Sequence, residues 1–327
     1  MHVQARSDGE TLSNSERASD LLSLVSPVVA GVLLQNPQRR AEDFAVPVPA
    51  KVLCADLTGF SVAGAALARS EARGAEELRD IVNAVFARVT AVIQLAGGQI
   101  LQFSGDAVTA VWPGDGDPGA QILCAIAAGL DLQKACRDLA VPGMVALQMW
   151  ETLAQGQIWI AHLTEGDASR ETVICGDVFD AFRGQTGRRD GVLLASSLWA
   201  QGAAVVGARA AVVAETVGVR VISLVGAAST PAPEPTSTAT DAAIIAGYVP
   251  GYLRDLLAGI ATDWLAEFRS AQIVFARFAG FRFQGSDDLP RLAILSKGLR
   301  RAIDDNGGVR LKFGADDKGL ILLAAWG

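Results

Sequence analysis

An internal repeat constrains the fold of this chain more than any single motif does. The segment VLCADLTGF at 52–60 aligns with IVFARFAGF at 273–281, and GGQILQFSGD at 97–106 aligns with GGVRLKFGAD at 307–316. Each copy predicts a strand, a Gly-Phe turn, a helix, a Gly-Gly pair and a β-hairpin whose second strand ends in Trp. We therefore expect two related units that mix helices with a mainly antiparallel sheet.

Apolar spacing predicts the remaining elements. A short apolar run followed by Asp-Leu-Thr-Gly-Phe indicates a buried strand and a turn at 51–60. Helices are expected at 21–36, 74–95 and 118–138, and strands at 99–103, 107–112, 145–150, 157–161, 192–194 and 272–275. A helical segment is also expected around 264–268.

The chain divides into four predicted parts. A segment rich in Pro, Ser, Thr and Ala at 227–239 lacks periodicity and reads as a linker. We expect a tail and helix at 1–49, a complete unit at 50–226, the linker region at 227–248 and a partial second unit at 249–327.

Composition excludes several classes of protein. Hydrophobic residues make up 50% of the 327 residues and charged residues 19%, which is too apolar for a disordered chain. A net charge of −7 without a basic block argues against nucleic-acid binding. The apolar stretch at 21–34 contains Pro27 and is shorter than the roughly 20 residues that a membrane span needs. With no signal peptide in the polar start, we expect a cytoplasmic protein without a transmembrane segment.

Two aspartates are the candidate metal ligands. Asp56 ends a predicted buried strand and Asp106 lies in a predicted hairpin tip. The predicted topology can bring these two carboxylates together, where a hard divalent cation such as Mg²⁺ would relieve their repulsion. The turn after Asp56 leads into a helix, so its backbone N–H groups can bind phosphate oxygens. Each aspartate taken alone could equally be a turn or cap residue.

The repeat gives the two units different charges at matching positions. Arg277 stands at the position of Asp56, and Lys312 stands at the position of Gln102. This difference suits a two-sided site, with metal on one half and substrate recognition on the other.

These segments resemble the catalytic domain of class III nucleotidyl cyclases. The resemblance rests on ADLTGFS (55–61), ARGAEELRDIVNAVF (72–86), ILQFSGDAVTAVW (100–112) and TVICGDVFDAFRGQ (172–185). It is greatest to the soluble, bicarbonate-responsive adenylyl cyclases with tandem C1 and C2 domains. It implies a ferredoxin-like α+β fold with a mainly antiparallel sheet flanked by helices, with C1 at 50–226 and a partial C2 at 249–327.

The resemblance implies conversion of ATP to cyclic AMP and pyrophosphate by two-metal-ion catalysis. Asp56 and Asp106 would hold two Mg²⁺ (or Mn²⁺) ions, and Lys312 would read the adenine ring. The implied triphosphate contacts are Leu57, Thr58, Gly59, Phe60 and Ser61, and Arg183 matches an arginine of the nucleotide or anion site. A C1/C2 pseudo-dimer or a homo-oligomer would complete the site, and the chain would be the N-terminal part of a larger cyclase.

Three positions depart from the family pattern. Phe179 stands where an asparagine is expected, and Gln102 replaces a lysine of the bicarbonate-responsive members, so activation by bicarbonate is not expected. Arg277 replaces the metal-binding aspartate of the second copy, which leaves one metal site per pair. Because the predicted second unit is only partial, a non-catalytic nucleotide-binding or regulatory module stays open, as does a guanylate cyclase, which Lys312 disfavours.

Overall fold

The structure is a computed structural model, and it describes residues 22–58, 73–114, 116–138, 147–165, 169–183, 190–226, 239–249 and 270–327. The described residues form two compact units. Unit 1 takes its elements from Pro49–Gly156 and Gly184–Glu234, and unit 2 takes its elements from Arg6–Val48, Gln157–Arg183 and Pro235–Gly327. Each unit therefore combines segments that are far apart in the sequence.

Unit 1 is built on a sheet whose strands run in the order β2-β3-β1-β4-β6-β8-β7. The strands are β1 (Phe44–Thr58), β2 (Gln99–Ser104), β3 (Ala107–Pro113), β4 (Gln148–Glu165), β6 (Val192–Ala195), β7 (Ala210–Glu215) and β8 (Gly218–Leu224). Their pairings are antiparallel between β1 and β3, β2 and β3, β6 and β8, and β7 and β8, whereas β4 and β6 are parallel. The prediction of a mainly antiparallel sheet is confirmed.

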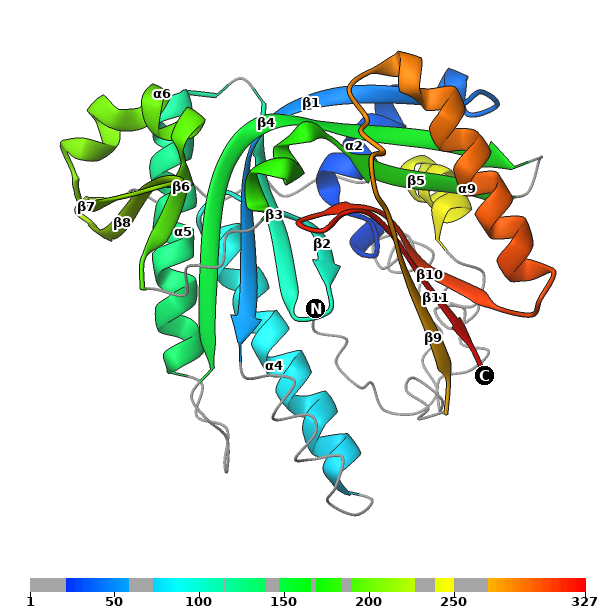
Figure 1. Cartoon of the computed structure of the whole chain (residues 1–327), viewed down its shortest axis with the longest axis horizontal. Helices are drawn as coiled ribbons and strands as arrows, with labels where there is room; N and C mark the ends of the chain where they lie inside the picture. Colours follow the sequence, from blue (N-terminus) through cyan, green and yellow to red (C-terminus); the bar gives the residue numbers. More distant parts are fainter. Residues whose placement is uncertain are drawn as a thin grey trace. The chain divides into compact units, whose positions relative to one another are not determined.

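Helices α4 (Arg73–Leu95) and α5 (Pro118–Arg137) lie against one face of this sheet (Figure 1). Their apolar side chains share a core with β1 and β3, which includes Val89, Ile126 and Leu53. The N-cap of α5 is Asp117, whose carboxylate accepts a hydrogen bond of 2.9 Å from the backbone N–H of Gly119. Helix α6 (Ser196–Gly207) packs beside β8 and α5.

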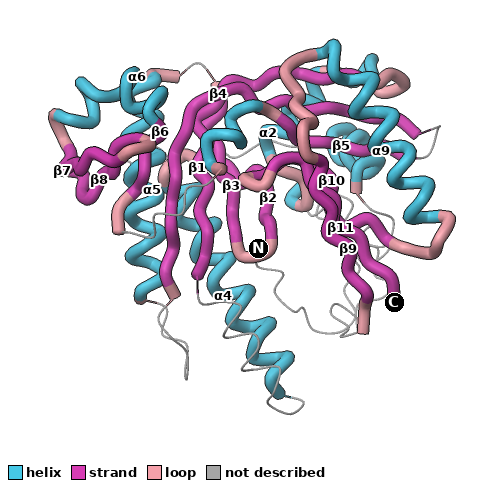
Figure 2. Tube along the Cα trace, viewed as in Figure 1, coloured by secondary structure: helices cyan, strands magenta, loops and turns pink. Residues whose placement is uncertain are grey.

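Unit 2 places elements from both sides of the predicted linker in one core. A three-stranded sheet in the order β10-β11-β9 is accompanied by helix α9 (Figure 2). Its elements are α2 (Pro27–Gln35), η1 (Pro37–Arg39), β5 (Ser169–Cys175), η2 (Asp177–Phe182), α7 (Ala239–Ile245), η3 (Ala246–Tyr248), β9 (Gln272–Phe278), η4 (Ser286–Asp288), α9 (Leu289–Asp304), β10 (Val309–Asp316) and β11 (Gly319–Trp326). Strand β5 pairs antiparallel with the second half of β4, and both contribute side chains to the core around α9 and β11.

The two copies of the repeat have the same topology. The order β2-β3-β1 in unit 1 matches β10-β11-β9 in unit 2. Asp56 pairs with Ala107, and Arg277 occupies the corresponding place opposite Ile321. The register shifts after Ile100 in β2 and at the corresponding Arg310 in β10, so Lys312 does occupy the position of Gln102.

The tryptophan that ends each copy makes the same contact. The indole N–H of Trp112 donates to the carbonyl of Ala96 at 2.9 Å, and that of Trp326 donates to the carbonyl of Asn306 at 3.1 Å. A Cβ on Gly98 would lie 2.7 Å from the Trp112 ring, and one on Gly308 would overlap Trp326 in the same way. The Gly-Gly pair is therefore needed because each tryptophan ring packs on its second glycine.

Some expected elements differ from the structure. The strands expected at 145–150 and 157–161 are one continuous strand, β4, within the described residues. The helix expected at 21–36 is confirmed in a shorter form as α2, which begins at Pro27 because proline is favoured in the first turn. The tail at 1–20, most of the linker and the helix expected around 264–268 lie outside the described residues. The four predicted domain boundaries stay a prediction.

Among the described helices, none combines the length and the apolar character that crossing a bilayer requires.

Strand β9 is the edge of its sheet, whereas the corresponding strand β1 lies between β3 and β4. Ile273 is 56% exposed and Val274 is 45% exposed, although Val52 and Leu53 at the corresponding positions are fully buried. Phe275, the next residue, is also exposed. An apolar edge strand of this kind is prone to pair with other chains.

We expect Val274→Lys to reduce concentration-dependent association of the protein, because a charged side chain on an edge strand opposes edge-to-edge pairing. Light scattering across a dilution series measures the effect. The matched control is Ile294→Lys, which makes the same kind of change at a 75% exposed position on α9. Equal effects of the two substitutions would assign the change to net charge and not to the edge of β9.

A buried carboxyl lies near the start of β4. Glu151 is 2% exposed, and it accepts a hydrogen bond from the side-chain amide of Gln133 on α5. The Gln133 amide also exchanges hydrogen bonds of 3.0 and 3.2 Å with the backbone of Gly191, whose carbonyl accepts a further bond of 2.9 Å from Arg220. Burial raises the pKa of Glu151 well above its usual value of 4.5, and the hydrogen bond from Gln133 only partly opposes this. The side chain is therefore protonated in the folded protein at pH values where the unfolded chain carries a charge there.

We expect the free energy of unfolding to fall as pH rises from about 4.5 through the raised pKa of Glu151. The folded state holds the proton that the unfolded state releases, so the slope is negative and at most about 1.4 kcal/mol per pH unit for one group. Urea unfolding between pH 5 and 9 measures this slope. Glu151→Gln should remove it, whereas Glu42→Gln at an exposed position should not. An unchanged slope in Glu151→Gln would contradict the assignment.

Candidate active site

The predicted pair of aspartates comes together at one end of the unit 1 sheet. Asp56 on β1 pairs with Ala107, the residue that directly follows Asp106. The backbone N–H of Leu57 donates a hydrogen bond of 3.2 Å to the carbonyl of Asp106, which ties the two segments together. Asp56 is exposed and Asp106 is half-buried, so both carboxylates belong to a surface that ligands can reach.

Strand alternation explains why Asp56 faces away from the core. Ala55 and Leu57 are buried, with Leu57 only 2% exposed, whereas Asp56 and Thr58 are not buried. Because successive side chains of a strand point to opposite faces, the apolar residues fix Asp56 and Thr58 on the other face. The core packing of β1 therefore orients the candidate metal ligand.

The hairpin that carries Asp106 has a two-residue loop. Ser104 pairs with Ala107, so Gly105 and Asp106 form the turn. Gly105 has a φ of +68°, and no described residue other than glycine has a positive φ. This combination fits a type II′ turn, which needs a positive φ at its first central residue. Glycine at 105 thus allows the aspartate to stand directly beside the end of β1.

Asp56 and Asp106 offer carboxylate oxygens, which are the donors that a hard cation such as Mg²⁺ prefers. Among the described residues, no group of three or more His, Cys, Asp or Glu side chains could hold a metal ion. Two neighbouring carboxylates are nevertheless what Mg²⁺ uses when substrate phosphates and water complete its shell. Asp56 and Asp106 could hold such an ion, and they do not form a closed protein cage.

The predicted phosphate-binding turn is described only in part. Leu57 is buried beneath the site, and the hydroxyl of Thr58 accepts a hydrogen bond of 2.5 Å from the indole N–H of Trp150 on β4. Gly59, Phe60 and Ser61 lie outside the described residues. The sequence did not indicate Trp150, because its contact joins residues 92 positions apart.

Lys312 belongs to unit 2, on strand β10. Its side chain is 16% exposed, and its ammonium group lies 3.4 Å from the carboxylate of Asp316. Burial lowers the pKa of Lys312, and the charge of Asp316 opposes that shift. Asp316 corresponds to Asp106 in sequence spacing, but it pairs with Gly319 inside a longer hairpin and is 3% exposed. The second copy of the repeat thus has a lysine–aspartate ion pair at the position where the first copy has Asp106, which is half-buried.

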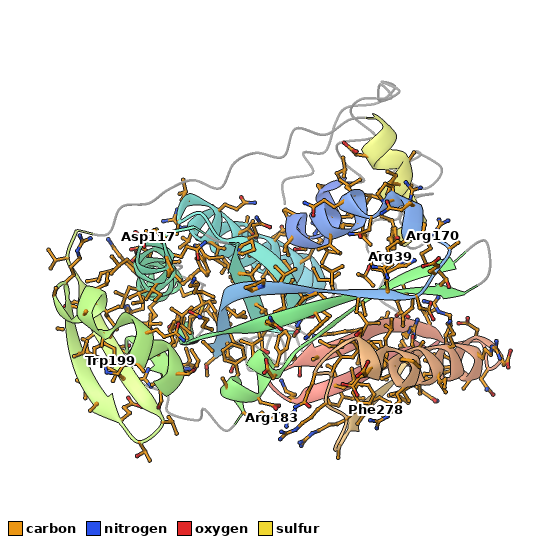
Figure 3. The ribbon with its side chains drawn as sticks, turned by 90° about the horizontal axis from the view of Figure 1, so that it is seen from above. Arg39, Asp117, Arg170, Arg183, Trp199 and Phe278 are labelled. Atoms are coloured by element: carbon orange, nitrogen blue, oxygen red, sulfur yellow. The ribbon has the colours of Figure 1, made fainter. Side chains whose placement is uncertain are left out.

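Arg183 also belongs to unit 2 and directly follows η2 (Figure 3). Its guanidinium lies 2.8 Å from the carboxylate of Asp180, and Arg282 approaches the same carboxylate at 3.8 Å. These side chains line a pocket that is partly open to solvent. Asp180 is a residue that the sequence analysis missed, although its i,i+3 spacing from Arg183 is a recognisable signal.

Phe179 is one of the residues that line the same pocket. It is 1% exposed, and its ring packs against that of Phe182 at a centroid distance of 6.4 Å. The residue at this position is therefore part of the apolar core of unit 2 and offers no hydrogen bond to a ligand.

No family model and no curated protein matches the sequence. Among solved structures, a class III adenylyl cyclase-like ATP-binding protein from Pseudomonas aeruginosa is similar over 86% of this chain and 64% of its own, with 12% identity and a TM-score of 0.53. The adenylyl cyclase CyaB from P. aeruginosa covers 56% of this chain and 96% of its own, with 16% identity and a TM-score of 0.43. The guanylyl cyclase Cya2 covers 56% of this chain and 94% of its own, with 20% identity and a TM-score of 0.42.

The chain has the class III nucleotidyl cyclase fold, with a mainly antiparallel sheet flanked by helices. This confirms the fold class and the resemblance at the level of the cyclase domain. The assignment to the soluble type with tandem C1 and C2 domains stays a prediction.

Proposed function

We propose that this chain is an adenylate cyclase that converts ATP to cyclic AMP and pyrophosphate. The observation that supports this most is the placement of Asp56 beside Asp106 at the end of β1. An exposed and a half-buried carboxylate on neighbouring strands suit two divalent ions that arrive with a triphosphate. The positive charge of such ions also suits an acidic protein, because it offsets the repulsion between the negatively charged chain and its nucleotide.

In the proposed reaction the ribose 3′-oxygen forms a bond to the α-phosphorus, the bond to pyrophosphate breaks, and the hydroxyl proton passes to solvent. When bound, metal ions would acidify the 3′-hydroxyl and neutralise the charge of the triphosphate. Asp56 and Asp106 would orient the reacting groups through those ions. Leu57, Thr58, Gly59, Phe60 and Ser61 would hold the triphosphate, and Lys312 would donate a hydrogen bond to adenine N1. A C1/C2 pseudo-dimer or a second copy of the chain would bring these halves together.

Product analysis tests this proposal. The purified protein is incubated with ATP or GTP and either Mg²⁺ or Mn²⁺, and cyclic nucleotide is separated and quantified. The proposal expects cyclic AMP that depends on metal and is abolished by Asp106→Asn. Nucleotide binding by calorimetry is measured on the same samples. Absence of both binding and product would overturn the proposal.

The second candidate is a nucleotide-binding module without cyclase activity. Phe179 favours it, because a buried phenylalanine stands where the resemblance implies a hydrogen-bonding asparagine. The similar protein from P. aeruginosa is itself described as ATP-binding and adenylyl cyclase-like. Binding of ATP with a metal ion and no cyclic product under any condition would select this candidate.

We expect Lys312→Met to weaken the preference for ATP over GTP, because it removes the proposed donor to adenine. The loss of one charged hydrogen bond corresponds to a decrease of about tenfold or more in kcat/KM for ATP. Steady-state kinetics with both nucleotides measure the change. Lys318→Met is the matched control, since Lys318 is 51% exposed and pairs with Asp317. An unchanged ATP/GTP ratio in Lys312→Met would assign adenine recognition to another residue.

A further inference from the structure

The contact between Trp150 and Thr58 connects the centre of the unit 1 sheet to the candidate active site. Strands β1 and β4 are neighbours in this sheet, and Thr58 is the last residue of β1. The indole nitrogen of Trp150 lies 2.5 Å from the Thr58 hydroxyl oxygen. Both side chains are half-buried, so the hydrogen bond is partly shielded from competing water.

The chemistry of the two groups fixes the direction of this hydrogen bond. An indole N–H can only donate, whereas a threonine hydroxyl has one hydrogen to donate and two lone pairs to accept with. The Thr58 oxygen therefore accepts from Trp150, and the hydroxyl hydrogen is directed to a different partner. Because threonine is branched at Cβ, a fixed oxygen position also selects its χ1 rotamer.

Thr58 lies on the same face of β1 as Asp56, two residues away, since side chains alternate along a strand. An acceptor that approaches the carboxylate pair with its metal ions would meet the Thr58 hydroxyl, whose oxygen already accepts from Trp150 and whose hydrogen can be donated. Phosphate oxygens are such acceptors. A hydroxyl set in this way loses little conformational freedom when the ligand binds.

We propose that Trp150 is a positioning residue for the triphosphate, acting through the Thr58 hydroxyl. The proposal rests on the proposed binding of a nucleotide at Asp56 and Asp106. Trp150 does not itself touch the nucleotide. Its indole N–H holds the Thr58 oxygen so that the hydroxyl hydrogen is donated to a phosphate oxygen.

Binding of ATP and of a non-hydrolysable ATP analogue, each with Mg²⁺, tests this proposal by calorimetry. Trp150→Phe keeps an aromatic ring and removes the N–H, and Thr58→Val removes the hydroxyl while keeping the branched shape. Each change should weaken binding about fivefold, the effect of one hydrogen bond. The double variant should bind no more weakly than Thr58→Val, because both changes remove the same interaction. In kinetics, KM should rise while kcat changes little.

The matched control is Trp159→Phe, which makes the same change on the same strand. The Trp159 ring packs against Phe283 in unit 2, with centroids 5.6 Å apart, so its substitution should leave nucleotide binding unchanged. Thr58→Ser keeps a hydroxyl, so this single variant should retain most of the nucleotide affinity. When Thr58→Ser is combined with Trp150→Phe, the protein should bind nucleotide as weakly as Trp150→Phe alone.

The indole N–H resonance of Trp150 in the unmodified protein provides a second test that does not depend on a tryptophan variant folding. It should shift on addition of the ATP analogue, and Thr58→Val should abolish that shift. If the affinity losses of the two single variants add up in the double variant, the positioning role is overturned. Unchanged affinity in Trp150→Phe would also overturn it. If the unmodified protein binds neither ATP nor its analogue, it is the proposed function that fails.

Discussion

Asp106→Asn should lower cyclic AMP formation about 10³-fold or more, because it removes the charge of one of the two proposed metal ligands. Stabilisation of developing charge by a bound metal ion is worth several kcal/mol, which corresponds to a loss of that size. The fold should tolerate the change. Asp106 is half-buried in a two-residue turn, and asparagine is well accepted in turns. Asp56→Asn should have an effect of similar size.

The measurements are single-turnover cyclase assays with Mg²⁺ and with Mn²⁺, together with direct Mn²⁺ binding by electron paramagnetic resonance. Asp117→Asn is the matched control. It removes a carboxylate from the same unit, and asparagine caps the N-terminus of α5 as well as aspartate does. Retention of Mn²⁺ binding and activity in Asp106→Asn would refute the proposed metal site, even if Asp56→Asn were inactive.

Much of the candidate site could be predicted from local sequence. A buried strand ended by an aspartate, together with a Gly-Asp turn in a hairpin, was sufficient to predict that Asp56 and Asp106 approach each other. The pattern is informative here because apolar alternation and turn chemistry both act over a few residues. The repeat then identified Arg277 and Lys312 as the residues at the corresponding positions, which the register confirms.

Long-range contacts explain what the sequence could not predict. The sequence predicts two short strands at 145–150 and 157–161, and the polar residues Glu151, Thr152 and Gln155 lie between them. The strand nevertheless continues through them, and the side-chain amide of Gln133 on α5 donates a hydrogen bond to one oxygen of the buried Glu151 carboxyl. The hydrogen bond from Trp150 to Thr58 likewise joins side chains that are far apart in the sequence. A sequence pattern reports burial along one element, and it does not report which distant group will pair with a polar side chain there.

The organisation of unit 2 also depends on such a contact. Glu171 on β5 and Arg310 on β10 belong to the predicted first and second copies, and their charged groups lie 2.5 Å apart. Their side chains are only 13% and 6% exposed. The hydroxyl of Ser296 on α9 donates to Glu171 at 2.5 Å and accepts from Arg310 at 2.9 Å. This cluster connects β5 to α9 and β10 through charged hydrogen bonds inside one core.

Glu171→Gln should destabilise unit 2 by about 3–5 kcal/mol, the usual cost of leaving one partner of a buried ion pair uncompensated. The positive charge of Arg310 would remain buried, and Arg300, 3.8 Å from Glu171, would add to the repulsion. Urea unfolding measures the loss, and amide hydrogen exchange in β5 and β10 should rise with it.

Two further variants separate this cost from a general effect of charge removal. Asp80→Asn breaks the Arg79–Asp80 pair on α4, whose side chains are 51% and 68% exposed, and it should cost less than about 1 kcal/mol. The double variant Glu171→Leu with Arg310→Met should recover most of the stability lost in Glu171→Gln, because apolar replacement removes both buried charges together. If Glu171→Gln costs no more than Asp80→Asn, the ion pair does not hold β5 to β10, and the shared apolar core of these strands accounts for the stability of unit 2.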